Sequence, residues 1–185
     1  MIIPTKLTDN SDKWIKAYDE FGKKFAKNAA DFFIESASYY LEFYNAIDTG
    51  YLLQSIEKHE IKKGYKVVAN TPYAAVVEYG RSPNSKNPPL DVIKKWVRRK
   101  KFDLSNVKCS WKLYNWLIAH RLMNPSRRGF EFLTQDERLT ILAFKIMKSI
   151  ASHGIEPRPF FRNAIEETKD NFDKILNQTK SEVTA

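Results

Sequence analysis

The sequence predicts an α+β fold in which a long N-terminal helix and C-terminal helices pack on a small antiparallel sheet. Apolar residues recur every three or four positions from Trp14 to Ile47, which is the spacing of one helical face. Two short alternating segments, 59–62 and 65–69, are typical of a β-hairpin. The helical spacing returns over 135–152 and again over 161–175, so helices also close the chain.

The first helix is expected to begin near Lys13, with Ser11 or Asp12 as its N-terminal cap. Unbroken, it would span about 50 Å at 1.5 Å per residue. Such a helix is longer than a small core needs. Two interpretations remain open: part of it packs on a neighbouring subunit, or it is simply a long core helix.

The tripeptide Asp48-Thr49-Gly50 ends the helical pattern. Aspartic proteases carry the same tripeptide, and their two aspartates share a proton. That function needs a strand before the aspartate and a small residue after the glycine, whereas here a helical pattern precedes and the bulky Tyr51 follows. The structural interpretation is therefore favoured: Asp48 caps a short helix over 51–56, and Gly50 allows the chain to turn.

The middle of the chain alternates short elements with turns. Lys63-Gly64 is expected to join the two strands of the hairpin. The apolar segment 73–80 is compatible with either helix or strand, because it is short and rich in alanine. A polar loop over 81–89 follows, and Pro89 is a suitable first-turn residue for a helix that runs through Val97.

The second half of the chain is predicted to be helical. One helix is expected over 110–123, and the helix over 135–152 should stop at Gly154. Pro157 and Pro159 punctuate the turn before the last helix.

The length of 185 residues fits a single domain, 1–185. The polar tail 177–185 is expected to fray.

The composition excludes several classes of protein. One cysteine, Cys109, and three dispersed histidines argue against a disulfide framework and a metal site. No run is long and apolar enough for a membrane span, and no catalytic set or phosphate-binding loop is visible, so we expect no enzyme activity and no cofactor. The formal net charge of +9 and a pI near 9.5 indicate either a polyanionic partner or only a soluble basic protein. The 14% of aromatic residues favours interfaces with other proteins.

One segment concentrates positive charge: six of the eight residues from 94 to 101 are basic. If the segment is helical, Trp96 and Val97 anchor it to the core while the charges project from the other faces. A polyphosphate-facing surface and an ordinary solvated helix face are both compatible with this pattern. The candidate residues are Lys94, Lys95, Arg98, Arg99, Lys100 and Lys101.

Four segments, taken in order, resemble one known family. Asp48–Ile56 is similar to its D-T-G-x-L-x-x-S-I segment, and Val68–Gly80 to its N-x-x-Y-A-x-x-x-E-x-G segment. Pro88–Leu90 resembles its proline-initiated helix, and Gly154–Phe161 its G-x-x-P-R-P-F turn. The family is the neck and tail-completion (head–tail joining) proteins of long-tailed bacteriophages, the gene-product-ten-like group, distantly like minor tail protein Z.

The resemblance implies structural roles for individual residues of these motifs. It also marks 102–134 as an insertion, because members of the family pass quickly from the basic helix to the closing helix. The motif residues are Asp48, Thr49, Gly50, Leu52, Tyr73, Glu78, Gly80, Gly154, Pro159 and Phe160.

The resemblance also implies a function: a non-enzymatic virion protein that forms a ring at the head–tail junction and helps join tail to capsid around the DNA channel. Its expected partners are further copies of itself, the tail terminator, the head-closure protein, the tail tube and viral DNA that passes nearby, with no membrane. It would be found in the virion, and in the host cytoplasm during assembly. The alternative is a free, sequence-nonspecific nucleic-acid-binding protein that uses the basic segment 94–101.

Overall fold

The structure is a computed structural model that describes residues 11–123 and 133–184. The chain divides into two compact units: unit 1 comprises residues up to 80 and from 157 onward, and unit 2 comprises 81–156. The sequence predicts one domain with an insertion at 102–134, whereas the structure gathers the whole of 81–156 into a unit of its own.

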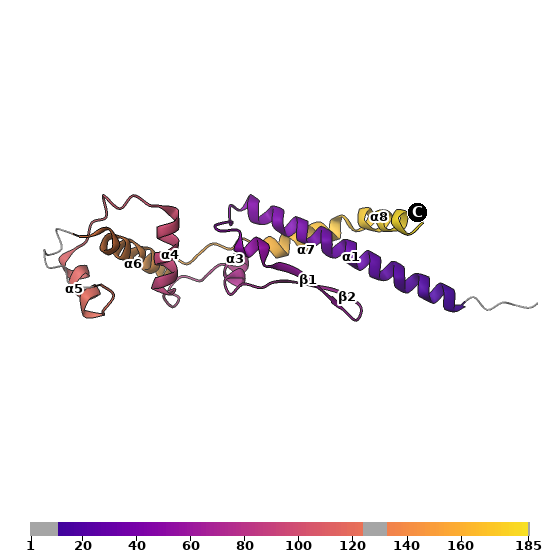
Figure 1. Ribbon diagram of the computed structural model, residues 1–185, viewed down its shortest axis with the longest axis horizontal. Helices are drawn as coiled ribbons and strands as arrows, with labels where there is room; N and C mark the ends of the chain where they lie inside the picture. The colour runs from indigo at the N-terminus through magenta and orange to yellow at the C-terminus, as the bar shows by residue number, and fades with distance from the viewer. Residues whose placement is uncertain (1–10, 124–132, 185) are drawn as a thin grey trace, which may run out of the picture. The chain divides into compact units, whose positions relative to one another are not determined.

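Unit 1 has the predicted α+β architecture: a long first helix, a two-stranded antiparallel sheet and two C-terminal helices. The segment 73–80, which the sequence left open between helix and strand, forms a short helix that ends at Gly80. Figure 1 shows α7 and α8 following one another along α1, with the hairpin beside the same helix. The elements of unit 1 are α1 (Ser11–Phe43), α2 (Tyr51–Gln54), β1 (Ile56–Ile61), β2 (Gly64–Ala69), α3 (Ala74–Tyr79), α7 (Phe160–Asp170) and α8 (Phe172–Thr184).

The hairpin turns one residue earlier than predicted. Ile61 pairs with Gly64, so the two-residue connection is Lys62-Lys63 and not Lys63-Gly64. Gly64 has a φ of 145°, a backbone conformation that side chains rarely adopt. The glycine therefore supplies its unusual conformation at the first residue of β2, just after the turn.

The core of unit 1 joins the long helix, the hairpin and the closing helix. Phe160 of α7 is 1% exposed and lies in one cluster with Leu41 of α1 and Ile56 of β1. Phe33 and Phe161 meet edge to face at the margin of this cluster, with their ring centroids 5.2 Å apart. The closing helix is therefore held by the same apolar residues that hold α1 on the sheet.

The C-terminal tail is helical over 177–184, contrary to the frayed end that its polar composition predicts. The reason is a set of contacts with α1. Thr179 is fully buried and its hydroxyl oxygen accepts a hydrogen bond from the amide of Asn28 at 3.0 Å. Asn28 also donates to Glu182 at 3.2 Å, and Lys24 forms an ion pair with the same carboxylate at 3.3 Å. A polar segment can remain ordered in this way because its polar atoms are paired.

The single closing helix predicted over 161–175 is divided into α7 and α8 at Asn171. The side-chain amide of Asn171 donates to the carbonyl oxygen of Glu167 at 2.9 Å. Asparagine side chains compete with the helical backbone for hydrogen bonds in this way and favour helix ends.

The described residues of unit 2, 81–123 and 133–156, form three helices, and sequence signals mark most of their ends. Pro89 is the N-cap of the first, Ser110 caps the second through the N–H of Leu113, and Gly154 ends the third. Thr134 and Glu137 form a reciprocal capping box at the start of the third helix. The helices are α4 (Leu90–Lys100), α5 (Trp111–Ala119) and α6 (Gln135–His153).

The core of unit 2 is built on both faces of α6. Tyr114 and Leu117 of α5 pack with Ile141 and Phe144 of α6. On the other face of α6, Val97 of α4 packs with two residues of that helix. Leu90 and Ile93 of α4 also pack against the first cluster, so α6 contributes to the apolar contacts of both α4 and α5.

The truncation Phe160→Ala should destabilise the protein by about 3–5 kcal/mol, because it removes a fully buried ring from the core that α1, β1 and α7 share. Urea unfolding followed by circular dichroism measures the change. The matched control is Phe43→Ala, since Phe43 is 67% exposed, and its expected cost is below about 1 kcal/mol. Equal stability of Phe160→Ala and the wild type would contradict this description of the core.

Candidate interaction surfaces

The basic segment forms helix α4, and its two predicted anchors pack as expected. Val97 is 1% exposed. The ring of Trp96 is partly buried and contacts the ring of Phe102, with the centroids 5.3 Å apart. Lys101 ends the helix in a left-handed conformation with a φ of 50°. The segment is therefore an amphipathic helix with a buried side and a charged side.

Part of the positive charge of α4 is directed at one carboxylate of unit 2. The guanidinium of Arg98 lies 3.1 Å and the ammonium of Lys94 lies 3.8 Å from Asp136 at the start of α6. These two cations therefore help to hold α4 against α6. Because each is already paired with a carboxylate, they are less suited to bind an external anion. The other four basic residues of the segment are exposed: Lys95, Arg99, Lys100 and Lys101.

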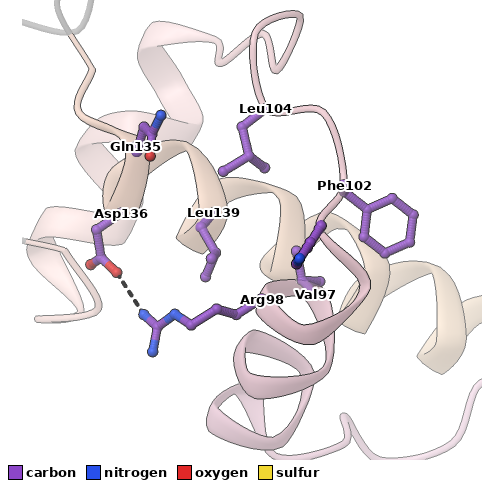
Figure 2. Close-up of a pocket in the computed structure, with 8 residues that line it drawn as sticks. Val97, Arg98, Phe102, Leu104, Gln135, Asp136 and Leu139 are labelled. Atoms are coloured by element: carbon purple, nitrogen blue, oxygen red, sulfur yellow. Dashed lines mark hydrogen bonds and ion pairs between the residues drawn. The ribbon is translucent and has the colours of Figure 1, made fainter. Parts of the chain in front are cut away.

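A cavity of about 370 Å³ opens beside the Arg98–Asp136 pair. Figure 2 shows the apolar side chains of Val97, Leu104 and Leu139 around it, with the ion pair on one wall. Its lining includes one carboxylate and no cysteine, serine, threonine or histidine. That carboxylate, Asp136, is already paired with Arg98.

The second and fourth motif segments meet at one buried carboxylate. Glu78 of α3 is 7% exposed, and its two oxygens accept the backbone N–H groups of Phe161 at 2.8 Å and of Arg162 at 3.1 Å. These are early N–H groups of α7, which have no partner inside the helix. The N–H of Arg158 also donates to the carbonyl oxygen of Val77 at 2.8 Å. We call these contacts the Glu78 clamp.

The Glu78 clamp explains the residues around it. Pro159 is the N-cap of α7 and has no side-chain oxygen, so the helix start takes its acceptor from another part of the chain. Tyr73 is the N-cap of α3, and Gly80 ends α3 with a φ of 72°. These motif residues shape the short helix that carries the carboxylate. Sequence reasoning missed the clamp, since a charged residue inside an apolar segment was its one signal.

The first motif segment contains one wrong prediction. Asp48 is not the cap of the short helix: the N-cap of α2 is Gly50, with a φ of 76° and no side-chain capping hydrogen bond. Glycine takes the N-cap position because the chain adopts a left-handed conformation there. Asp48 lies two residues before this position. The hydroxyl of Thr49 accepts weakly from the N–H of Tyr51 at 3.4 Å. Leu52 is buried in the core of unit 1.

In unit 2, Gly154 has a steric role as well as a conformational one. Its φ is 81°, and a Cβ there would lie 2.2 Å from the backbone oxygen of Arg81. The backbones of Arg81 and Ile155 exchange two hydrogen bonds of 2.8 and 2.9 Å at this point. A side chain at 154 would separate the two segments, so only glycine fits.

The first turns of α1 carry an uncovered apolar stripe. Trp14, Ile15 and Tyr18 are 66%, 59% and 75% exposed, and every residue from 12 to 20 is exposed. Further along, Phe25 meets Phe172 of α8 edge to face, with the ring centroids 5.1 Å apart. Helix α1 is therefore exposed in its first turns and contacts α8 further along, at Phe25.

Other residues that might carry chemistry are not assembled into a site. Burial raises the pKa of the Cys109 thiol, which disfavours the nucleophilic thiolate. Across 11–123 and 133–184, no group of three or more histidine, cysteine or acidic residues could hold a metal ion. None of the helices in those ranges is long and apolar enough to cross a membrane.

Comparison with known proteins gives no relative: no family model, no curated protein and no solved structure matches the chain.

The variant Glu78→Ala should lose stability by about 1.5–3 kcal/mol, because hydrogen bonds to a charged group are stronger than neutral ones and two N–H groups of α7 lose their acceptor. Glu78→Gln keeps one acceptor oxygen and should lose less. The exposed Glu60→Ala is the control and should change stability by at most about 0.5 kcal/mol. Urea unfolding measures all three, and a loss no larger for Glu78→Ala than for the control would contradict the clamp.

Proposed function

We propose that the chain is a structural virion protein of a tailed bacteriophage: a neck or tail-completion component that forms a ring and helps join tail to capsid. It is not an enzyme and needs no cofactor in this role. The observation that carries the proposal is the apolar stripe at the start of α1, exposed on a helix that is ordered over 33 residues.

The stripe suits contact between subunits. Trp14 and Tyr18 are large aromatic residues, which are enriched at protein interfaces. They lie one helical turn apart, so a partner can cover both at once. Ring formation and the candidate neighbours follow from the family resemblance and not from the stripe. The candidates are another copy, the tail terminator, the head-closure protein and the tail tube.

The Glu78 clamp supports the resemblance itself. The four motif segments are weak signals one by one, but the second and the fourth contact each other in unit 1 through Glu78, Phe161 and Arg162. A chance match of short motifs gives no reason for such contact. The clamp supports the family assignment, and the function follows only through that assignment.

A second candidate function is free, sequence-nonspecific nucleic-acid binding by the segment 94–101. The exposed basic residues Lys95, Arg99, Lys100 and Lys101, in α4 and at its C-cap, favour it. In a gel-filtration and duplex-titration comparison, this candidate predicts salt-dependent binding by the isolated monomer. The neck proposal predicts ring formation that depends on partners.

The double variant Trp14→Glu/Tyr18→Glu should fold normally, because both side chains are exposed, but should fail to join heads to tails. The readout is electron microscopy of particles made by a phage whose own copy of this gene is replaced by the variant. Separate heads and tails are the expected result, with an unchanged melting temperature of the purified variant.

The matched control is Tyr51→Glu/Tyr79→Glu, which places two glutamates at aromatic positions of unit 1 that are 56% and 69% exposed. It should give joined particles. Normal particles from the Trp14/Tyr18 variant, or equal failure of the control, would show that the stripe has no special role in assembly.

A further inference from the structure

The net positive charge of the protein comes from unit 2. Residues 81–156 contain 16 lysines and arginines against 6 aspartates and glutamates, a net charge of +10. The rest of the chain contains 15 against 16, a net charge of −1. A polyanionic partner would therefore be attracted to unit 2 and not to unit 1.

Within unit 2, one face combines α5 and α6. Lys112, Trp116 and His120 lie four residues apart on the exposed side of α5, so they form one stripe. The ring of Trp116 stacks on His120, with the centroids 3.9 Å apart, and contacts Phe144 of α6 at 4.9 Å. The ammonium of Lys148 lies 5.7 Å from the centroid of the same Phe144 ring.

Lys145 extends this face toward the segment before α5, since its ammonium donates to the carbonyl oxygen of Lys108 at 2.5 Å. A backbone carbonyl does not neutralise the ammonium charge. We call the surface the α5–α6 face; it comprises Lys108, Lys112, Trp116, His120, Lys145 and Lys148.

The parts of α5 and α6 that carry the α5–α6 face contain no acidic residue, and the two acids of α6, Asp136 and Glu137, lie in its first turn. The sequence has no aspartate or glutamate from 104 to 130 or from 138 to 155. In α4, by contrast, Lys94 and Arg98 form ion pairs with Asp136. The lysines of α5 and α6 therefore keep their charge available, whereas α4 uses part of its own internally.

We infer that the α5–α6 face binds a nucleic-acid backbone without reading its sequence. Lysine is depleted at protein–protein interfaces, but it is a common phosphate contact, and an acid-free row of lysines matches a polyanion of uniform sign. Each phosphate that a lysine neutralises releases condensed counterions, which supplies affinity that falls with salt. The inference goes beyond the proposed function and the alternative above, because it assigns the contact to α5 and α6 and not to the segment 94–101.

The experiment measures binding of the full-length protein to a fluorescein-labelled 20-base-pair duplex and to labelled dT20 by anisotropy, from 50 to 300 mM NaCl. The test variant is Lys112→Ala/Lys145→Ala/Lys148→Ala. The control variant, Lys23→Ala/Lys62→Ala/Lys63→Ala, removes the same charge from exposed positions of unit 1. A third variant, Lys95→Ala/Lys100→Ala/Lys101→Ala, removes it from α4.

We expect the wild type to bind both probes. The test variant should weaken duplex binding at least tenfold at 100 mM NaCl and flatten the log–log salt slope by about 2–3, since each phosphate contact contributes about 0.9. The control should stay within about threefold of the wild type, and the corresponding triple lysine-to-arginine variant of the face should restore binding. Circular dichroism and melting curves verify that every variant is folded.

Four results would overturn the inference: no binding of either probe by the wild type at 50 mM NaCl, equal losses in the test and control variants, a loss confined to the α4 variant, or displacement of DNA by polyglutamate as effective as by unlabelled DNA. The last result would assign the face to an acidic protein. Any of these four results would leave the neck proposal intact, because that proposal is tested separately by head–tail joining with the Trp14/Tyr18 variant.

Discussion

Unit 1 is assembled from two stretches of chain that flank residues 81–156, and the first turn of α7 is where these stretches are fastened. Two interactions act there on opposite sides. The carboxylate of Glu78 accepts the N–H groups that the helix cannot pair itself, and the ring of Phe160 fills the core against α1 and β1. Without Glu78, the N-terminal N–H groups of α7 would have no acceptor. Without the ring of Phe160, the core beneath the helix would contain a cavity. The position of α8, which follows α7 after one residue, depends on the same turn.

The clamp also explains why the apolar segment 73–80 tolerates a buried acidic residue. A buried carboxylate is costly unless its oxygens are hydrogen-bonded, and both oxygens of Glu78 accept a backbone N–H. The positive end of the helix dipole stabilises the negative charge further. Glu78 therefore supplies the acceptor that Pro159, the N-cap of α7, lacks. The short helix α3, which ends at Gly80, positions this carboxylate.

Much of this fold could be predicted from the sequence because its signals are local. Pro89, Thr134 with Glu137, and Gly154 mark helix ends within a few residues, and the apolar spacing of α1 and α6 is regular. The parts that could not be predicted depend on distant partners. The order of the polar tail rests on Asn28 of α1, and the Glu78 clamp joins residues more than eighty positions apart. The division into two units was also missed, although the net charge of +10 over 81–156 against −1 for the rest of the chain was a signal of it. Likewise, the segment 94–101 was predicted as a binding surface from its density of positive charge. The sequence does not show that Lys94 and Arg98 form ion pairs with Asp136.

The paired backbones of Arg81 and Ile155 have a consequence for how this chain can change with time. They bring the entry and exit of unit 2 together, so everything between them is a loop that leaves and returns at one place. The entropy cost of closing such a loop grows only by about 0.6 kcal/mol for each doubling of its length. Insertions, deletions or wholesale replacement between these two residues thus place little thermodynamic burden on unit 1. Natural selection can remodel the charged unit while the scaffold that presents the stripe stays constant, provided that residue 154 remains a glycine.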